Sequence, residues 1–135
     1  MEYVTATNLE FVELFKGLEA VKNVKGTRFA FIVAKNLKEL NRYLTPFEKQ
    51  AIPTKAFQEV AAKAHELAEA ENAEGIKKLE EENAELIKER KAQLAAIEQM
   101  MQEEAVVALE LIREDQLPED LSTDQLLPLL RMIKS

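Results

Sequence analysis

The run from Ile76 to Glu104, which contains no Gly or Pro, constrains this chain more than any other stretch. Its apolar residues recur at intervals of three, four, or seven to eight, the spacing of a coiled-coil seam on one helix. We predict a single helix of about 29 residues, roughly 44 Å long. A seam requires a partner helix, so the run predicts packing rather than chemistry. Its positions are Ile76, Leu79, Leu86, Leu94, Ile97 and Met101, with Asn83 and Arg90 in two polar gaps.

Charge and aromatic content separate the chain into two parts. Residues 1–57 carry nine Lys and Arg against six acidic residues, whereas residues 58–135 carry nine against nineteen, for a net charge of −7. All eight aromatic side chains also lie in residues 1–57. We expect a compact core built mainly from the N-terminal segments and a solvated, acidic helical arm in the remainder.

The residue types argue against several classes of function. Cysteine is absent and His65 is the only histidine, so thiol chemistry and imidazole-based metal clusters are not expected. The N-terminus lacks the apolar run of a signal peptide, and no stretch has the length and apolar content of a transmembrane helix. We expect a cytoplasmic protein that needs no cofactor.

The N-terminal segments predict a strand followed by a helix. Residues 2–6 have the β-branched and aromatic bias of a short strand. Thr7 or Asn8 can cap a helix that runs to about Lys22, with Glu10 favourable near its positive N-terminus.

A second helix is predicted over residues 27–44, where apolar residues repeat at three and four. Phe29 and Phe31, which we assign to the core, also alternate with their neighbours, so a strand over residues 27–33 is the competing interpretation. Pro46 and Pro53 are expected to interrupt the helical structure, since proline disfavours helix at the preceding residue.

The middle of the chain predicts a helical hairpin. A third helix should begin at Thr54, and residues 72–75 offer the only break before the long helix. These four residues form either a tight turn or, with Gly75 inside one continuous helix, a weak point of about 1 kcal/mol. We favour the turn, because it folds the alanine-rich third helix back on the long one.

After Glu104 the pattern changes to alternation over residues 105–112, which we interpret as a short strand beside residues 2–6, tying the two ends of the chain together. A helix that continues to Ile112 is the alternative. The sequence Ser122-Thr-Asp-Gln125 resembles a capping box that opens a last helix through Ile133. Pro128 is expected either to kink this helix or to confine its regular part to the C-terminal side.

These elements predict a mainly α single domain, an elongated, coiled-coil-like antiparallel helical hairpin with a small two-stranded β pairing of its terminal segments. Residues 1–57 would form the aromatic-rich core part, residues 54–104 the hairpin arm, and residues 105–135 a short strand and a C-terminal helix.

No catalytic constellation is present. Three glycines in the chain do not build a phosphate-binding loop, and His65 has no identifiable nucleophile or orienting group beside it. Asn83 at the seam either specifies the register of the paired helices or marks a position where the seam is exposed to solvent. Basic residues between Lys16 and Arg42 do not outweigh the negative net charge, so nucleic-acid binding is not expected. The glutamates considered for a cation site, and interpreted instead as a solvated ion-paired face, are Glu80, Glu81, Glu82, Glu85 and Glu89.

Several short segments together carry a family resemblance. Phe29–Leu44 contains Ala-Lys-Asn, a Lys/Glu-rich helical middle follows, and Val106-Val-Ala-Leu-Glu-Leu-Ile precedes Leu117-Pro-Glu-Asp. This order resembles a family of small phage and prophage proteins of unknown function. Val106 and Ala108 stand where the family often has acids, and Pro128 interrupts the last helix. The resemblance implies a phage origin and a non-enzymatic accessory role.

We therefore expect a phage-encoded interaction protein, not an enzyme, that acts as a virion or tail structural component or assembly factor through helical packing. The alternative is a host-takeover inhibitor that binds a bacterial enzyme, with the acidic helical face as its contact surface. The partner is a protein or a second copy of the chain; no metal, cofactor, membrane or nucleic acid is expected. The protein would act in the host bacterial cytoplasm or within the virion. The candidate interaction residues are Ile76, Leu79, Asn83, Leu86, Leu94, Ile97, Met101, Leu126 and Leu130.

Overall fold

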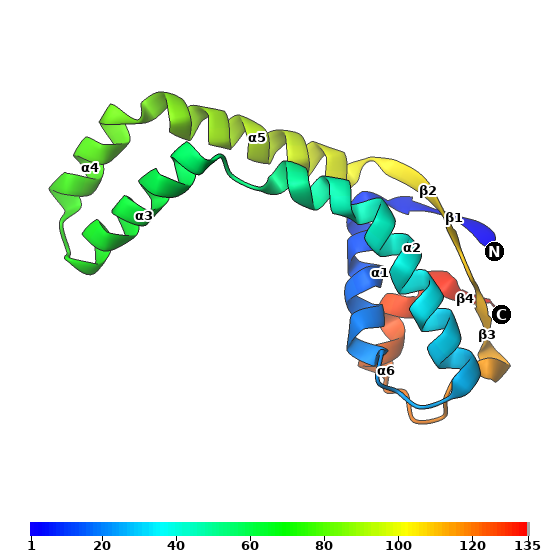
Figure 1. The fold of residues 1–135 in the computed structure, drawn as a ribbon. Helices are drawn as coiled ribbons and strands as arrows, with labels where there is room; N and C mark the ends of the chain where they lie inside the picture. Colours follow the sequence, from blue (N-terminus) through cyan, green and yellow to red (C-terminus); the bar gives the residue numbers. More distant parts are fainter. Residues whose placement is uncertain (135) are drawn as a thin grey trace. The chain divides into compact units, whose positions relative to one another are not determined.

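The computed structural model describes residues 1–134, which are mainly α-helical with small two-stranded sheets (Figure 1). The chain divides into two compact units. We call residues 1–46 with 100–134 the core unit, and residues 47–99 the hairpin. Two helices, α2 and α5, have residues in both.

The core unit begins with β1 (Glu2–Thr7) and α1 (Asn8–Val21), as the sequence predicts. Thr7 is the N-cap of α1: its hydroxyl accepts from the Glu10 N–H at 3.1 Å, and its own N–H donates to the Glu10 carboxylate at 2.9 Å. This reciprocal box satisfies two backbone donors that the first turn leaves unpaired.

The strand β2 (Glu104–Leu109) pairs antiparallel with β1, with Val4 opposite Val107. The predicted pairing of residues 2–6 with residues 105–112 is therefore present, although β2 ends at Leu109 and the helical alternative for this segment is wrong. Contrary to our expectation, this strand pair does not join the two ends of the chain. The last strand, β4 (Ile133–Lys134), pairs instead with β3 (Ile112–Arg113), in parallel.

The helix α2 (Thr27–Ala51) confirms helix over the competing strand, but it continues through Pro46, where an interruption was predicted. Proline removes only the hydrogen bond to the carbonyl of Arg42, and both residues are exposed, so solvent can satisfy that carbonyl. The helix ends just before the second proline, Pro53, as expected. Phe31, which we placed in the core, is 55% exposed, with Lys35 Nζ 5.3 Å from its ring centroid.

The tail of the chain folds differently from the predicted C-terminal helix. Ser122 forms the expected capping box with Gln125, but the α-helix that it opens, α6 (Thr123–Leu126), is only four residues long. A 3₁₀ helix, η2 (Leu127–Met132), follows, with Pro128 near its start, where a missing N–H costs nothing. A further 3₁₀ turn, η1 (Glu114–Gln116), precedes this region.

Among residues 1–134, every buried apolar side chain lies in the core unit. Most come from the N-terminal segments, as expected, but β2, β3 and the tail also contribute. They are Ala6, Phe11, Leu14, Leu18, Val21, Phe29, Ile32, Val33, Leu40, Leu44, Val107, Leu109, Ile112, Leu129 and Met132.

The hairpin consists of the last turn of α2, then α3 (Lys55–Glu69), α4 (Ala73–Glu82) and most of α5 (Ala84–Gln102). The helices α3 and α4 lie side by side and antiparallel (Figure 1). A turn does separate them, but it lies over residues 70–72 rather than the predicted 72–75, and Glu71 adopts a positive φ of 55° there. Gly75 lies in the first turn of α4, where its N–H donates to the Asn72 side chain.

The predicted single helix from Ile76 to Glu104 is wrong, because Asn83 ends α4 and separates it from α5. The Asn83 side chain donates to the Leu79 carbonyl at 2.9 Å, the same acceptor that its backbone N–H uses. An asparagine side chain that competes for backbone groups in this way favours a helix end over a helix interior. α5 then ends at Gln102, since Glu104 already belongs to β2.

Candidate interaction surfaces

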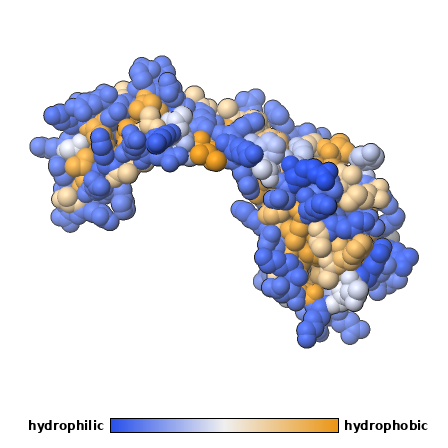
Figure 2. Space-filling model, in the orientation of Figure 1, coloured by the Kyte–Doolittle hydropathy of each residue, from blue (hydrophilic) through white to orange (hydrophobic). Residues whose placement is uncertain are grey.

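None of residues 47–99, all of which the structure describes, is buried. The apolar positions of α3 and α4 are only half-buried, among them Phe57, Leu67, Ile76 and Leu79. Figure 2 shows hydrophobic surface between the charged side chains of this unit. The hairpin therefore holds an apolar stripe that its own helices cover incompletely.

Two polar residues of α5 fasten it to the end of α2. Arg90 donates to the Ala51 carbonyl at 3.0 Å, and Gln93 donates to the carbonyls of Gln50 and Ile52 at 2.6 and 3.1 Å. These are carbonyls that the end of a helix leaves without an intrahelical partner. Arg90 also lies over the Phe57 ring, 5.9 Å from its centroid. The polar gap that we assigned to Arg90 is thus a helix cap.

The other predicted interaction residues fall into three groups. Leu86 lines the same small hollow as Phe57 and Arg90, and Ile97 is half-buried on the same side of α5. Leu94 does not share this face and is 48% exposed. Met101, Leu126 and Leu130 lie in the core unit, outside the hairpin.

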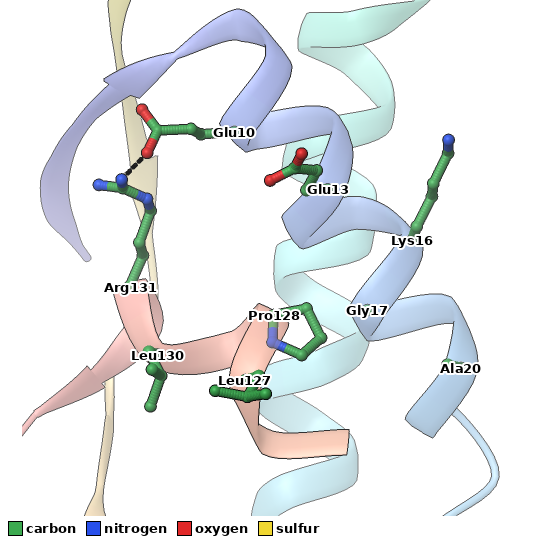
Figure 3. A pocket seen from close by; sticks show the side chains of 9 residues that line it. All are labelled: Glu10, Glu13, Lys16, Gly17, Ala20, Leu127, Pro128, Leu130 and Arg131. Atoms are coloured by element: carbon green, nitrogen blue, oxygen red, sulfur yellow. Dashed lines mark ion pairs between the residues drawn. The ribbon is translucent and has the colours of Figure 1, made fainter. Parts of the chain in front are cut away.

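The core unit carries an open groove of about 790 Å³ between α1 and the tail (Figure 3). Pro128 packs against Gly17 so closely that a Cβ on Gly17 would lie 2.7 Å from the Pro128 Cβ, so this contact requires glycine. Arg131 forms an ion pair with Glu10 across one end. Leu130, at the rim, is 57% exposed, whereas Leu126 is half-buried.

A fully buried asparagine, which the sequence analysis did not single out, joins α2 to the end of β2. Asn36 donates to the Glu110 carbonyl at 2.9 Å and accepts from the Glu110 N–H at 2.8 Å. The Glu110 carboxylate lies 3.7 Å from both Lys35 Nζ and an Arg28 guanidinium nitrogen. The sequence feature that could have indicated its burial is the helical spacing, because Asn36 lies four residues from both Ile32 and Leu40 on the apolar face of α2.

A second buried asparagine joins three elements of the core unit. The Tyr43 hydroxyl donates to the Asn8 side-chain oxygen at 2.6 Å, and the Asn8 amide donates to the Met100 carbonyl at 2.7 Å. The Asn8 backbone N–H also donates to the Glu103 carbonyl at 3.0 Å. Burial, and then the nearby Glu103 carboxylate, raise the pKa of Tyr43 above its usual 10.0.

The raised pKa of Tyr43 predicts a loss of stability in alkali. The fold favours the protonated phenol, so this contribution is fully present below pH 10 and is lost as the pH rises through the higher folded-state pKa. We expect Tyr43→Phe to flatten the fall in the free energy of unfolding above pH 10, measured by urea titration. Tyr3→Phe, at an 82% exposed position, is the control and should leave the fall unchanged. An unchanged pH dependence in Tyr43→Phe would rule this explanation out.

Two features of residues 1–134 concern membrane insertion and metal binding. None of the described helices is sufficiently long and apolar to cross a membrane. The part of the chain that the structure describes also brings no three His, Asp or Glu side chains together as a metal site would. The five glutamates considered for a cation, Glu80, Glu81, Glu82, Glu85 and Glu89, are all exposed on α4 and α5.

Comparisons with protein-family models, with curated proteins and with solved structures found no match for this chain.

Proposed function

We propose that this protein is a phage-encoded, non-catalytic interaction protein that acts in virion or tail assembly, and that the hairpin packs against its partner. The observation that carries the proposal is the absence of any buried residue in residues 47–99. The order of short segments that resembles small phage proteins supports the phage origin.

The balance of free energy supports a role in packing. Full burial of a large apolar side chain contributes about 1.5–3 kcal/mol, and the hairpin obtains only part of this at each position. Its helices contain 15, 10 and 19 residues, and helices in proteins obtain most of their stability from tertiary packing of an apolar face. A partner helix that covered the apolar stripe would stabilise the hairpin and bind in the same step.

The chemistry of the partner follows from α5. Leu94 and Ile87 are one heptad apart, and Lys88 and Lys91 flank them without an ion pair to any described residue. Ile87, Lys88 and Lys91 line a shallow hollow there, together with Ala84 and one acidic residue, Glu80. These features fit an amphipathic helix that has an apolar stripe and acidic flanks, packed in a coiled-coil-like manner.

The test is affinity capture of the tagged protein from infected or lysogenic cells, with the wild type compared with Leu94→Asp. We expect the wild type to recover capsid or tail proteins, and Leu94→Asp to recover at least about tenfold less, because the aspartate would be buried in the interface. Leu86→Asp should also abolish assembly, but Leu86 lies against Phe57 and Arg90, so that variant would disturb the hairpin itself.

The matched control is Ala96→Asp, which adds the same charge at an exposed position on another face of α5 and should leave recovery unchanged. Circular dichroism should give the same helix content for both variants. Equal recovery by wild type and Leu94→Asp would contradict the proposal.

A host-takeover inhibitor is the second candidate function. Glu81, Glu85 and Glu89 are exposed, recur every four residues, and form no ion pair with any described residue. Such a protein should be toxic when expressed in the host and should recover one host enzyme in near-equal amount. Replacing the three glutamates by glutamine should remove both effects, whereas an assembly protein would keep its virion partners.

A further inference from the structure

The solvent-facing side of α2 carries a stripe of basic side chains. Positions that alternate three and four residues apart between residues 28 and 42 lie on one face of the helix, opposite the face that Ile32, Asn36 and Leu40 bury in the core. Four of these five positions hold Lys or Arg, one holds Phe, and none is acidic. We call them the basic stripe: Arg28, Phe31, Lys35, Lys38 and Arg42.

The charges of the basic stripe are only loosely satisfied within the chain. Arg28 and Lys35 share the Glu110 carboxylate, each at a nitrogen–oxygen distance of 3.7 Å. Arg42 lies 3.9 Å from the Glu39 carboxylate. These distances exceed those of charge-assisted hydrogen bonds, so the cations keep donors for another acceptor. Both acids are also less exposed than the cations beside them, so the surface that a partner meets is positive.

Two members of the basic stripe are open to a partner in different ways. Lys38 is exposed and forms no ion pair with any described residue. Phe31 is 55% exposed, and a partner side chain that covered its ring would remove apolar surface from water. The stripe therefore combines positive charge with an aromatic residue, a pairing that is enriched at protein interfaces.

We propose that the basic stripe binds a helix of a partner protein that presents an acidic stripe of its own. Residues 28, 35 and 42 are seven residues apart, as are residues 31 and 38, which is the spacing of a coiled-coil seam, roughly 21 Å long here. Glu or Asp at the same spacing on the partner would face the four cations, and one apolar residue would cover Phe31. Charge complementarity thus defines the occupant.

This occupant differs from the helix proposed for the hairpin, whose contact stripe is apolar. The inference does not rest on the proposed role of the hairpin, because the basic stripe lies in the core unit.

Nucleic acid is also a polyanion, but the basic stripe suits it less well. Single-stranded nucleic acid stacks successive bases on several aromatic side chains, whereas the stripe has only Phe31, and the Lys35 ammonium lies 5.3 Å from the centroid of that ring. A duplex carries one negative charge per about 1.7 Å along its length, and it would meet a chain of net charge −7. An acidic helix presents its charge only where the stripe is positive.

The test uses a labelled, alanine-based helical peptide of about 21 residues, with glutamates at the seam positions and one leucine among them. Fluorescence anisotropy at about 50 mM NaCl should show saturable binding to the wild type below about 1 mM. A peptide with glutamine in place of each glutamate should not bind. Lys38→Glu, which breaks no ion pair, should weaken binding at least about tenfold, and Phe31→Ala about threefold.

Two control variants separate the basic stripe from other surfaces. Lys16→Glu makes the same charge reversal at an exposed position on α1 that has no ion pair with a described residue, and Leu94→Asp alters the hairpin. Both should bind the acidic peptide as the wild type does. No saturable binding by the wild type, or an equal loss in Lys16→Glu and Lys38→Glu, would overturn the proposal. Binding of oligo-dT that Lys38→Glu abolishes, without binding of the acidic peptide, would overturn it in favour of nucleic acid.

Amide chemical shifts of the ¹⁵N-labelled wild type keep the proposal testable if a variant does not fold. Titration with the acidic peptide should shift the amides of residues 28–42 and leave those of α3 and α4 unchanged. Shifts confined to the hairpin would refute this binding surface.

Discussion

Replacing Asn36 by Ala is expected to lower the free energy of unfolding of the core unit by about 2–4 kcal/mol. Asn36 is fully buried, and its side chain satisfies both the N–H and the C=O of Glu110. Alanine would leave these two backbone groups without partners where little water reaches, which costs more than the loss of an exposed hydrogen bond. Urea titration followed by near-UV circular dichroism measures the change.

Two further variants separate the hydrogen bonds from other effects at this position. Asn41→Ala removes an exposed asparagine from the same helix and should change stability little. Asn36→Asp keeps an acceptor for the Glu110 N–H but loses the donor to its carbonyl, and it buries a charge, so it should also destabilise strongly. If Asn36→Ala were as stable as Asn41→Ala, the bonds to Glu110 would not hold β2 to α2.

Replacing Leu129 by Ala is expected to cost about 2–5 kcal/mol, whereas Leu130→Ala should cost almost nothing. These adjacent leucines lie in η2, but Leu129 is fully buried and Leu130 is 57% exposed. Deleting the buried side chain leaves a cavity beneath the tail, near the contact of Pro128 with Gly17. The same urea titration compares the two variants.

The pair also tests the role of the tail. The interaction role that we expected for Leu126 and Leu130 stays a prediction. The tail itself packs into the core unit through Leu129 and Met132. Equal losses in Leu129→Ala and Leu130→Ala would mean that the tail packs differently from this arrangement.

Local patterns predicted the elements whose signals lie within a few residues. The Thr7 and Ser122 capping boxes, the alternation in β2 and the turn before α4 are such signals, because the residues that determine them are neighbours in sequence. The strand pairing was also predictable, since residues 2–6 and 105–112 were the only two segments that we assigned as strands. The single long helix was not, because Asn83 fits a seam position as well as a helix end.

Long-range contacts explain the other errors. The local pattern places Arg90 in a polar gap of the seam, but its hydrogen-bond partner is the Ala51 carbonyl, 39 residues earlier in α2. Pro128 reads as a kink, and only the position of Gly17 shows that the proline is a packing residue. Asn36 is a polar residue in an apolar pattern, and the hydrogen-bond partner that explains it, Glu110, lies 74 residues later in the sequence. Patterns within a few neighbouring residues do not reveal partners that lie so far apart in the sequence.

The segments that carry the family resemblance meet at one of these contacts. Lys35 and Asn36 belong to the Ala-Lys-Asn sequence of α2, and Glu110 lies within the alternating segment, directly after β2. Asn36 bonds to the backbone of Glu110, and the Lys35 ammonium lies near its carboxylate. The two segments therefore act together to hold β2 against α2, which is a structural role within the core unit. The contact proposed with a virion or tail protein involves the hairpin instead.

Hydrogen exchange of the free protein, and of its complex with the recovered virion protein, tests the role of the hairpin most directly. A hairpin without buried residues should exchange its α3 and α4 amides at least about 100-fold faster than α1 and β2 in the free protein. Binding should then slow exchange in the hairpin, most strongly around Ile87 and Leu94. A free hairpin as protected as the core unit, or protection by the partner confined to the core unit, would contradict the account.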